Sequence, residues 1–468
     1  MKSQPPIGFS RRQLLRNSGV GLGLLGLAGV MADDHSLHAA TGDASSNPLA
    51  AKEAHFAGRA KRVVHFFLNG GPSHIDTFDP KPMLAKYSGQ PLPQSYITER
   101  KTGGALPSTF KFDKYGQSGL EISELFARTA AHADDIAVIR SMTAQVPNHE
   151  PSLLLMNCGD SVQPRPSVGS WILYGLGTEN QNLPGFIAMC PNGYPVSDKA
   201  NWQSGFLPGS FQGTYVDTQY RKIEQLIENI RSTHATSEIQ QHQLALLRKL
   251  ESVRTQANTD PRLDARIESF ELAFRMQSEA SDVFDIQSEP RHIHELYGDT
   301  THGRQTLIAR RLLERGVRYV QLWHGAGQPW DHHSDIEKNL KQNAGEIDQP
   351  IAALLTDLKQ RDMLKDTLVI WGGEFGRTPV SEGGSGRDHN HYGFTVWMAG
   401  GGIRGGMTYG ATDDFGFKAI EKVSTVHDLH ATILHLLGFD HERLTYRYAG
   451  RDFRLTDVHG NVMHEILG

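Results

Sequence analysis

Four short segments of the sequence carry carboxylate and imidazole side chains that could together bind a divalent metal ion. Metal ligands must converge from several loops held by a rigid sheet. A lone Asp–His pair on a loop is more often a solvated turn or a helix cap, so one segment alone would be weak evidence. Because each segment follows an apolar run or its turn, the set predicts a metal site. The segments contain Asp76 and Asp79, Asp331 with His332 and His333, Glu374, and Asp388 to His391.

Short apolar strands must position these segments. Residues 63–68 are a continuous run of β-formers that ends at Asn69-Gly70-Gly71, which is typical of a buried parallel strand opening into a loop. Similar runs occur at 317–324 and 367–373, and an amphipathic helical segment at 336–361 separates them. This alternation predicts a doubly wound, mainly parallel α/β sheet with helices on both faces. Ligand sites in such sheets lie at the carboxyl ends of the strands.

Length and composition set the frame for this fold. The 468 residues are 38% hydrophobic, enough for one large α/β domain or two smaller ones. The formal net charge of -5 gives no electrostatic reason to expect nucleic acid or an anionic membrane surface as a partner. Residues 220–275 are charged, nearly free of glycine and of low β-propensity, which predicts a peripheral helical insert without a catalytic role.

The N-terminus has the layout of an export signal. Arg11 and Arg12 precede a short, glycine-rich apolar run, which resembles a twin-arginine signal peptide and is too short for a stable membrane span. Cleavage is expected near residue 40, with a polar spacer at 41–61 before the domain at 62–468. The expected partner is therefore the twin-arginine export machinery, and the expected location is the periplasm or the exterior. Twin-arginine substrates commonly fold and bind a cofactor before export, which agrees with a metal. The only cysteines, Cys158 and Cys190, leave one disulfide open as an alternative.

Several motifs along the mature chain resemble one family. They are "GGPSHIDTFDPKP", "NHEPSLLLMNCG", "SGFLPGSFQGT", "WDHH", "GGEFGRTP", "GRDHNHYGFTVWMAGGGIRGG" and "VHDLHATILHLLG". As a set they resemble the secreted, uncharacterised DUF1501 family. Their order is also similar to that of the alkaline phosphatase-like superfamily, which includes sulfatases and cofactor-independent phosphoglycerate mutases. The resemblance implies an alkaline phosphatase-like sheet over residues 62–468.

The same resemblance implies metal ligands near two of the predicted strands. Asp331 and His333 match an Asp and a His that the superfamily places before a long helix. Glu374 stands at the Asp of the usual Asp-His-Gly turn, and Phe375 replaces the His, so a second metal site would be depleted. His332 is interpreted as a neighbour of the ligands.

Further ligands follow from the remaining motifs. His389 matches a late His ligand, and Asp388 is expected either to bind the metal or to orient His389. Near the N-terminus Asn69 stands where the superfamily has an acidic residue, so Asp76 would substitute for it from further along the loop. We expect Asp76 and His149 at the rim of the metal site.

The candidate catalytic residues are His149 and Arg377. His149 stands where mutases carry a Ser at a helix N-terminus, and imidazole can attack phosphorus. A metal-ligating His149, an attacking Ser152 and a metal-bound water are the alternatives. Arg377, together with Arg387, could hold an anionic substrate oxygen, although a surface ion pair is the default for an arginine. No cysteine has the CxPSR spacing that formylglycine sulfatases need.

Two classes of function follow. The first is a secreted metal-dependent hydrolase of phosphate or sulfate esters, sulfatase-like without formylglycine, that uses Zn²⁺, Mn²⁺, Ca²⁺ or Mg²⁺ on a small-molecule or saccharide ester. The second is a non-catalytic metal- or ligand-binding protein on the same fold, which Phe375 and Asn69 favour. Metal content and a panel of ester substrates would distinguish the two classes.

Overall fold

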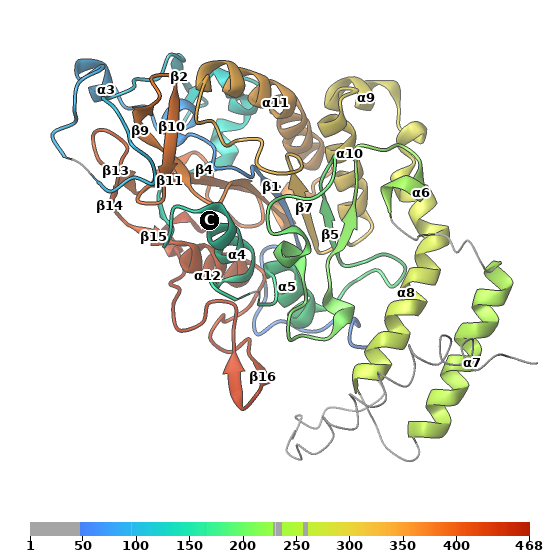
Figure 1. Ribbon diagram of the computed structural model, residues 1–468. Helices are drawn as coiled ribbons and strands as arrows, with labels where there is room; N and C mark the ends of the chain where they lie inside the picture. Colours follow the sequence, from blue (N-terminus) through green and yellow to red (C-terminus); the bar gives the residue numbers. More distant parts are fainter. Residues whose placement is uncertain (1–46, 95, 164, 228–229, 231–235, 256–260) are drawn as a thin grey trace, which may run out of the picture. The chain divides into compact units, whose positions relative to one another are not determined.

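A nine-stranded sheet lies at the centre of the residues that the computed structural model describes, which are 47–468 except 95, 164, 228–229, 231–235 and 256–260 (Figure 1). The expected signal peptide lies outside these residues. All neighbouring strands are parallel except where β11 pairs with β4 and β8, which confirms the mainly parallel sheet. In spatial order the strands are β12 (Met407–Tyr409), β4 (Ile136–Thr143), β11 (Phe394–Ala399), β8 (Thr367–Gly372), β1 (Arg62–Phe67), β7 (Tyr319–Trp323), β5 (Phe186–Met189) and β6 (Thr214–Val216), and β15 (Ser424–Thr425) also pairs with β4.

Helices cover both faces of the sheet, as the alternating sequence pattern predicted. Successive side chains of a strand point to opposite faces. Val64 and Phe66 of β1 therefore pack into one core with α10 (Thr301–Glu314) and α11 (Ile336–Gln360), whereas Val63 and Phe67 pack into a second core. The helices of the second core are α4 (His149–Cys158), α5 (Val168–Leu176) and α12 (Val426–Leu436).

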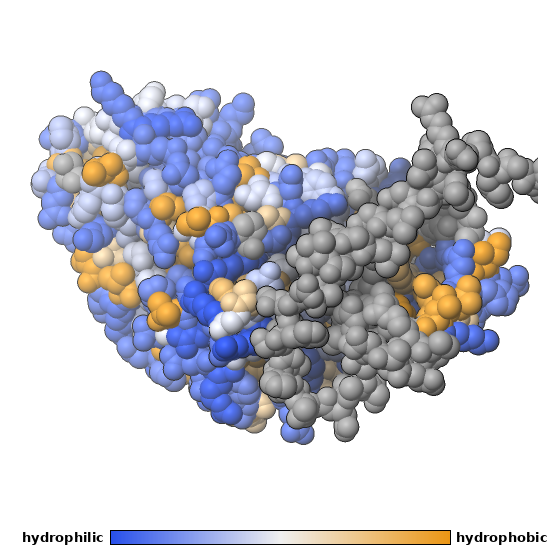
Figure 2. Space-filling model, turned by 60° about the horizontal axis from the view of Figure 1, so that its bottom comes forward, coloured by the Kyte–Doolittle hydropathy of each residue, from blue (hydrophilic) through white to orange (hydrophobic). Residues whose placement is uncertain are grey.

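Two long helices follow β6 in the chain. They are α7 (Ser237–Thr255) and α8 (Pro261–Phe284), so the helical region ends beyond the expected boundary at 275. The last turns of α8 contribute Val283 and Phe284 to the core beside α10. On the face shown in Figure 2, hydrophobic residues form small groups separated by hydrophilic ones.

Short elements complete the described chain. Residues 47–468 form one compact unit, so the end of the expected spacer packs on the domain through the buried Leu49. Among the helices described, none is long and apolar enough to cross a membrane. Both cysteines are free and buried. The short elements are α2 (His74–Thr77), α3 (Met83–Lys86), α6 (Ile223–Leu226), α9 (Arg291–Tyr297), and the hairpin strands β2 (Phe112–Tyr115), β3 (Leu120–Ser123), β9 (Gly376–Glu382), β10 (Gly386–Asn390), β13 (Ala411–Thr412), β14 (Ala419–Glu421), β16 (Tyr446–Tyr448) and β17 (Arg451–Phe453).

Candidate metal centre

Three neighbouring strands end at the same edge of the sheet, and the loops that follow them build the candidate site. In the register of the sheet, Phe67 of β1 lies opposite both Trp323 of β7 and Gly372 of β8. The loop after β7 carries Asp331, and the segment after β8 carries Glu374 and continues into the β9–β10 hairpin. The site therefore lies at the carboxyl ends of parallel strands, where open α/β sheets bind ligands.

The loop after β1 is tied closely to the loop after β7. The Nδ2 of Asn69 donates hydrogen bonds to the carbonyl oxygens of Gly325 (2.8 Å) and Gly327 (2.6 Å). Gly70 has a φ of 114°, and a Cβ at this position would lie 2.6 Å from the backbone nitrogen of Asp331. Only glycine fits this conformation and this close approach without strain. Asn69, at a position where an acidic ligand was expected, thus has a structural role in holding Asp331.

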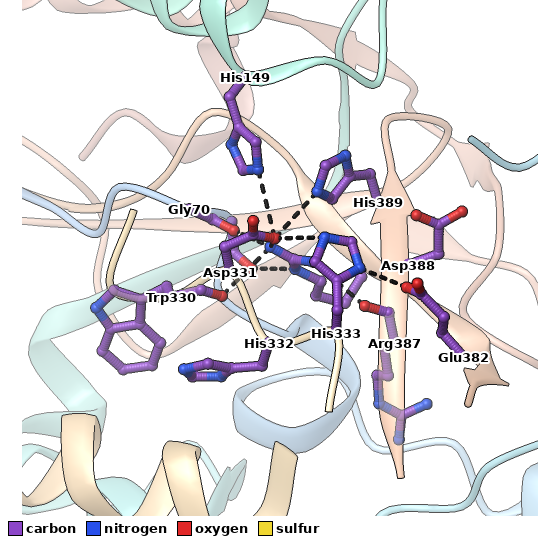
Figure 3. Close-up of polar contacts among 12 residues, drawn as sticks. Gly70, His149, Trp330, Asp331, His332, His333, Glu382, Arg387, Asp388 and His389 are labelled. Atoms are coloured by element: carbon purple, nitrogen blue, oxygen red, sulfur yellow. Dashed lines mark hydrogen bonds and ion pairs between the residues drawn. The ribbon is translucent and has the colours of Figure 1, made fainter. Parts of the chain in front are cut away.

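One carboxylate oxygen, Asp331 Oδ1, is the meeting point of the site (Figure 3). Three imidazole Nε2 atoms approach it, from His333 at 2.8 Å, from His389 at 3.1 Å and from His149 at 3.4 Å. The Nη2 of Arg377 donates to the same oxygen at 2.6 Å. The structure thus brings Asp331, His333 and His389 together, and it places His149 in the centre of the group instead of at its rim.

A glutamate holds each of the three imidazoles through Nδ1. A carboxylate accepts a hydrogen bond from Nδ1–H, so this contact indicates the tautomer in which Nε2 carries the free lone pair. The same carboxylate–histidine arrangement orients metal-ligating histidines in proteins. The pairs are His149 with Glu374 (2.7 Å), His389 with Glu99 (2.5 Å), and His333 with Glu382.

The spacing and the missing hydrogen-bond partners of these donor atoms are typical of ligands around a cation. The Nε2 atoms of His149 and His333 are buried and have no hydrogen-bond partner among the described residues, although both lie within ion-pairing distance of Asp331. Ligand atoms about 2.1 Å from a tetrahedral Zn²⁺ lie about 3.4 Å apart. The observed spacings of 2.8 to 3.4 Å to Asp331 Oδ1 are close to this value. The donor atoms of His149, Asp331 and His389 all lie within 4.8 Å of one another and could therefore hold one divalent ion, whereas His333 approaches Asp331 but forms its own group with Glu382 and Asp388.

The electrostatics of the group favour a positive charge at its centre. Burial lowers the pKa of His149, but the contacts with Asp331 and Glu374 outweigh it and raise that pKa to about 9. Burial would raise the pKa of Asp331, yet the three imidazoles and Arg377 hold it well below its usual range. The site therefore favours a proton or a metal ion at His149 and His333 while Asp331 stays ionised, whereas burial lowers the pKa of His389.

Arg377 is a buried residue whose guanidinium contacts Asp331. Its guanidinium donates to the carbonyl oxygens of Gly71 (3.0 Å), Arg387 (3.2 Å), Gly70 and Trp330 as well as to Asp331, and its side chain is only 1% exposed. This position suits a residue that orients Asp331. The sequence suggested that Arg377 holds an anionic substrate oxygen. In the structure its guanidinium is already surrounded by protein acceptors, which leaves little room for such an oxygen.

Asp76 lies in a separate ion pair. Arg387 Nε donates to Asp76 Oδ2 at 2.8 Å, and Ser73 Oγ donates to the same oxygen at 2.6 Å. Among the described residues, Asp76 belongs to no group of three or more potential ligands with mutually close donor atoms. The structure therefore does not bring the expected ligand Asp76 to the three imidazoles, because Arg387 binds its carboxylate.

Asp388 lies between two of the glutamate–imidazole pairs. One of its oxygens accepts a hydrogen bond from the backbone nitrogen of Arg100 at 2.7 Å, and the other is buried without a partner among the described residues. Asp388 can group with His389 and Glu99, or with His333 and Glu382, with all donor atoms within 4.8 Å of one another. Its unpartnered oxygen could bind a cation, whereas the hydrogen bonds that orient His389 come from Glu99 and Asp331.

Two acidic residues of the site, Glu99 and Glu382, were not singled out in the sequence. A third, Glu374, was expected to bind the metal but contacts an imidazole instead. Glu374 reaches His149 Nδ1 and the backbone nitrogen of Gly70 (2.9 Å), so it orients an imidazole. Glu99 follows no predicted strand, and no signal in the sequence marked it. Glu382 lies at the end of β9, and β9 pairs with β10, the strand that carries Asp388 and His389. A predicted hairpin over 376–390 would have placed Glu382 beside these residues.

Phe375 and Ser152 lie close to the imidazoles but have other partners. The ring of Phe375 packs 4.8 Å from that of His149 and 4.7 Å from that of His389, measured between ring centroids. Phe375 thus supports two of the imidazoles where the superfamily pattern has a ligand. Ser152 Oγ donates to the carbonyl oxygen of Val146 at 2.7 Å and is buried within the start of α4.

Comparison with known proteins identifies a family and several distant structures. The family model described as "Protein of unknown function (DUF1501)" matches residues 60–467. No curated protein matches the sequence. Similar solved structures include Ps i-CgsB in complex with k-i-k-neocarrahexaose (11% identity over 67% of this chain and 66% of that chain, TM-score 0.32), the PsFucS1 sulfatase from Pseudoalteromonas sp. (12% over 82% and 69%, 0.35) and the lipoteichoic acid synthase LtaP from Listeria monocytogenes (7% over 87% and 78%, 0.36). The chain spans about two thirds of the length of the first of these.

Proposed function

The chain belongs to the DUF1501 family, and we propose that it is a metal-dependent hydrolase of phosphate or sulfate esters. One observation carries the proposal. The Nε2 atoms of three imidazoles lie within 3.4 Å of Asp331 Oδ1, and those of His149 and His389 form one close group with it, while a glutamate holds each imidazole from the other side. Imidazoles that only stabilised the fold would not need to direct three Nε2 atoms at one carboxylate, two of them buried without a hydrogen-bond partner among the described residues.

The donor set favours a transition metal. The imidazole nitrogens of His149 and His389 and the carboxylate oxygen of Asp331 suit Zn²⁺ or Mn²⁺, whereas Ca²⁺ and Mg²⁺ prefer sets made of oxygen. When bound, such an ion would polarise the ester and lower the pKa of an attacking water molecule. Glu99, Glu374 and Glu382 would keep the Nδ1 proton on their imidazoles and so fix the rings in position.

An anionic ester would find further support at the N-terminus of α4. This helix begins at His149, and the side chain of its N-cap residue Asn148 makes no capping hydrogen bond. The first N–H groups of a helix and its dipole favour phosphate or sulfate oxygens. Because Pro151 has no N–H, the free donors at this helix end are the backbone N–H groups of His149 and Glu150, on the side of the site on which His149 lies.

Water is the attacking group that this geometry favours. His149 has Glu374 at Nδ1, and a metal ion bound between Nε2 and Asp331 would occupy the remaining lone pair, so neither nitrogen would then be free to attack an ester. Ser152 is buried and bonded to Val146. Cys158 and Cys190 are buried, and burial raises the pKa of both thiols, which disfavours a thiolate nucleophile.

A substrate screen tests the proposal. We expect the purified chain to hydrolyse at least one of an aryl phosphate, an aryl phosphodiester and an aryl sulfate after incubation with Zn²⁺ or Mn²⁺. Chelation should remove the activity, and the same ion should restore it. Stoichiometric metal without turnover on an enlarged panel that includes sulfated saccharides would contradict the hydrolase and support the non-catalytic binding protein.

We also propose that the protein is exported by the twin-arginine route, on the basis of Arg11 and Arg12 before a short apolar run. The double variant R11K/R12K should accumulate at its full length in the cytoplasm, while the wild type should lose about 40 residues, as is usual for such signals. Immunoblotting of cell fractions measures both forms. The variant K61R/R62K, with equally conservative changes at the start of the domain, should be exported normally. Export of R11K/R12K at the wild-type rate would contradict this route.

A further inference from the structure

A second group of histidine and glutamate side chains lies on the other side of Trp330 from the metal centre. His324 directly follows β7, His302 lies in the first turn of α10, and Glu346 lies on α11. The imidazole of His324 and the indole of Trp330 are 5.5 Å apart between ring centroids, and the indole also packs against His332. Three successive elements of the chain therefore contribute one side chain each to this group.

The donor atoms of this group have the spacing of metal ligands. Glu346 Oε2 lies 3.1 Å from His324 Nε2 and 3.6 Å from His302 Nε2, and the two imidazole rings stack with centroids 4.4 Å apart. All three residues offer donor atoms within 4.8 Å of one another. Two imidazoles and one glutamate form a donor set that zinc proteins use, with a remaining position open to water.

The group combines a buried imidazole with a carboxylate that reaches solvent. The side chain of His324 is 4% exposed, and its Nδ1 has no hydrogen-bond partner among the described residues, whereas that of Glu346 is 41% exposed. An ion could thus enter from solvent at Glu346 and be held by the buried imidazoles.

We propose that His302, His324 and Glu346 form a second binding site for a divalent transition metal ion of the zinc type. The site shares no residue with the group around Asp331, and it does not rest on the hydrolase proposal. A bound ion would link α10 and α11 to the start of the loop that carries Asp331. Binding to the folded chain alone would also raise its thermal stability.

Metal counting in a background without the first site tests this proposal. Asp331→Asn removes the central carboxylate of the first site, and Zn²⁺ is then titrated against a chromophoric chelator. We expect the Asp331→Asn chain to bind one Zn²⁺ and to gain thermal stability on adding it. Glu346→Gln or His302→Gln in the same background should each lower the affinity for Zn²⁺ at least roughly tenfold. Loss of a metal ligand costs more affinity than loss of a residue that only contacts a ligand. Glu337→Gln, an ion-paired position on the exposed side of α11, is the matched control and should change nothing.

The outcomes separate the two sites. If the Asp331→Asn chain binds no Zn²⁺, or if Glu346→Gln and His302→Gln leave its binding unchanged, the second site does not exist. The side chain of Glu346 is partly exposed, and the glutamine of Glu346→Gln keeps an oxygen that can accept a hydrogen bond from the imidazoles. We therefore expect this variant to fold. Failure of the hydrolase proposal would instead appear in the wild type, as absent turnover or absence of an ion that depends on Asp331.

Discussion

The Asp331→Asn protein is expected to lose both the metal ion bound at Asp331 and its hydrolytic activity. Asparagine keeps the shape of the side chain but removes the negative charge on which three imidazoles and Arg377 converge. Loss of outer contacts to metal ligands costs about 10–100-fold in affinity. Loss of the central carboxylate should therefore cost more than about 100-fold, and turnover should fall with it. Metal analysis after dialysis and steady-state assays on the best substrate of the screen measure the two effects.

Asp76→Asn is the matched control for this prediction. Both aspartates are ionised partners of a buried arginine, but Asp76 contacts Arg387 and no imidazole of the site. Removing one partner of a buried pair costs about 3–5 kcal/mol of stability, because the remaining charge stays buried. We expect Asp76→Asn to unfold at lower denaturant concentration while it retains its metal. Loss of the metal from folded Asp76→Asn, or its full retention by Asp331→Asn, would contradict the assignment of these two carboxylates.

The same pair has a predictable pH dependence. Burial raises the pKa of Asp76, but Arg387 and the hydrogen bond from Ser73 outweigh it and lower the pKa below its usual value. A carboxyl group whose pKa is lower in the folded than in the unfolded state stabilises the fold above the unfolded pKa of about 3.9. The stabilisation by Asp76 should thus be complete at neutral pH and disappear as the pH falls below about 4. Asp76→Asn should lack this part of the acid destabilisation.

His149→Gln has the second large expected effect. If His149 is a metal ligand held by Glu374, the variant should bind its metal about 100-fold more weakly, and high metal concentrations should restore part of the activity. If His149 is instead the nucleophile, the variant should retain its metal, and no metal concentration should restore turnover. Metal affinity and turnover measured across a series of metal concentrations distinguish these readings. We expect the first outcome, because Nε2 of His149 lies 3.4 Å from the oxygen of Asp331.

His430→Gln is the control for loss of a buried histidine. The Nε2 of His430 contacts the carbonyl oxygen of Met156 at 2.8 Å, an interaction that the amide of glutamine can replace. We expect a modest change in stability and no change in metal affinity. Equal loss of metal from both variants would indicate that general destabilisation, and not a missing ligand, causes the effect of His149→Gln.

Residue order was sufficient to predict the type of fold. A parallel strand buried on both faces must be apolar along its whole length, and the runs at 63–68 and 367–373 met this condition. The structure has β1 at Arg62–Phe67 and β8 at Thr367–Gly372 as neighbours in parallel. Periodicity carries no information about which strands pair, so the antiparallel position of β11 between β4 and β8 became known only from the structure.

For the site, the sequence determined the types of ligand and the loops that carry them, because Asp331, His333 and His389 lie in motifs beside strand ends or in a glycine-rich hairpin. Tertiary structure decided which carboxylates join them. Asp76 and Glu374 both follow a predicted strand and were both expected to bind the metal. In the structure Asp76 binds Arg387, and Glu374 orients His149. Glu99 is 290 residues from His389 in the chain and still lies 2.5 Å from its Nδ1. Which carboxylate reaches which imidazole depends on distances that only the packed loops set, and local sequence patterns do not encode those distances.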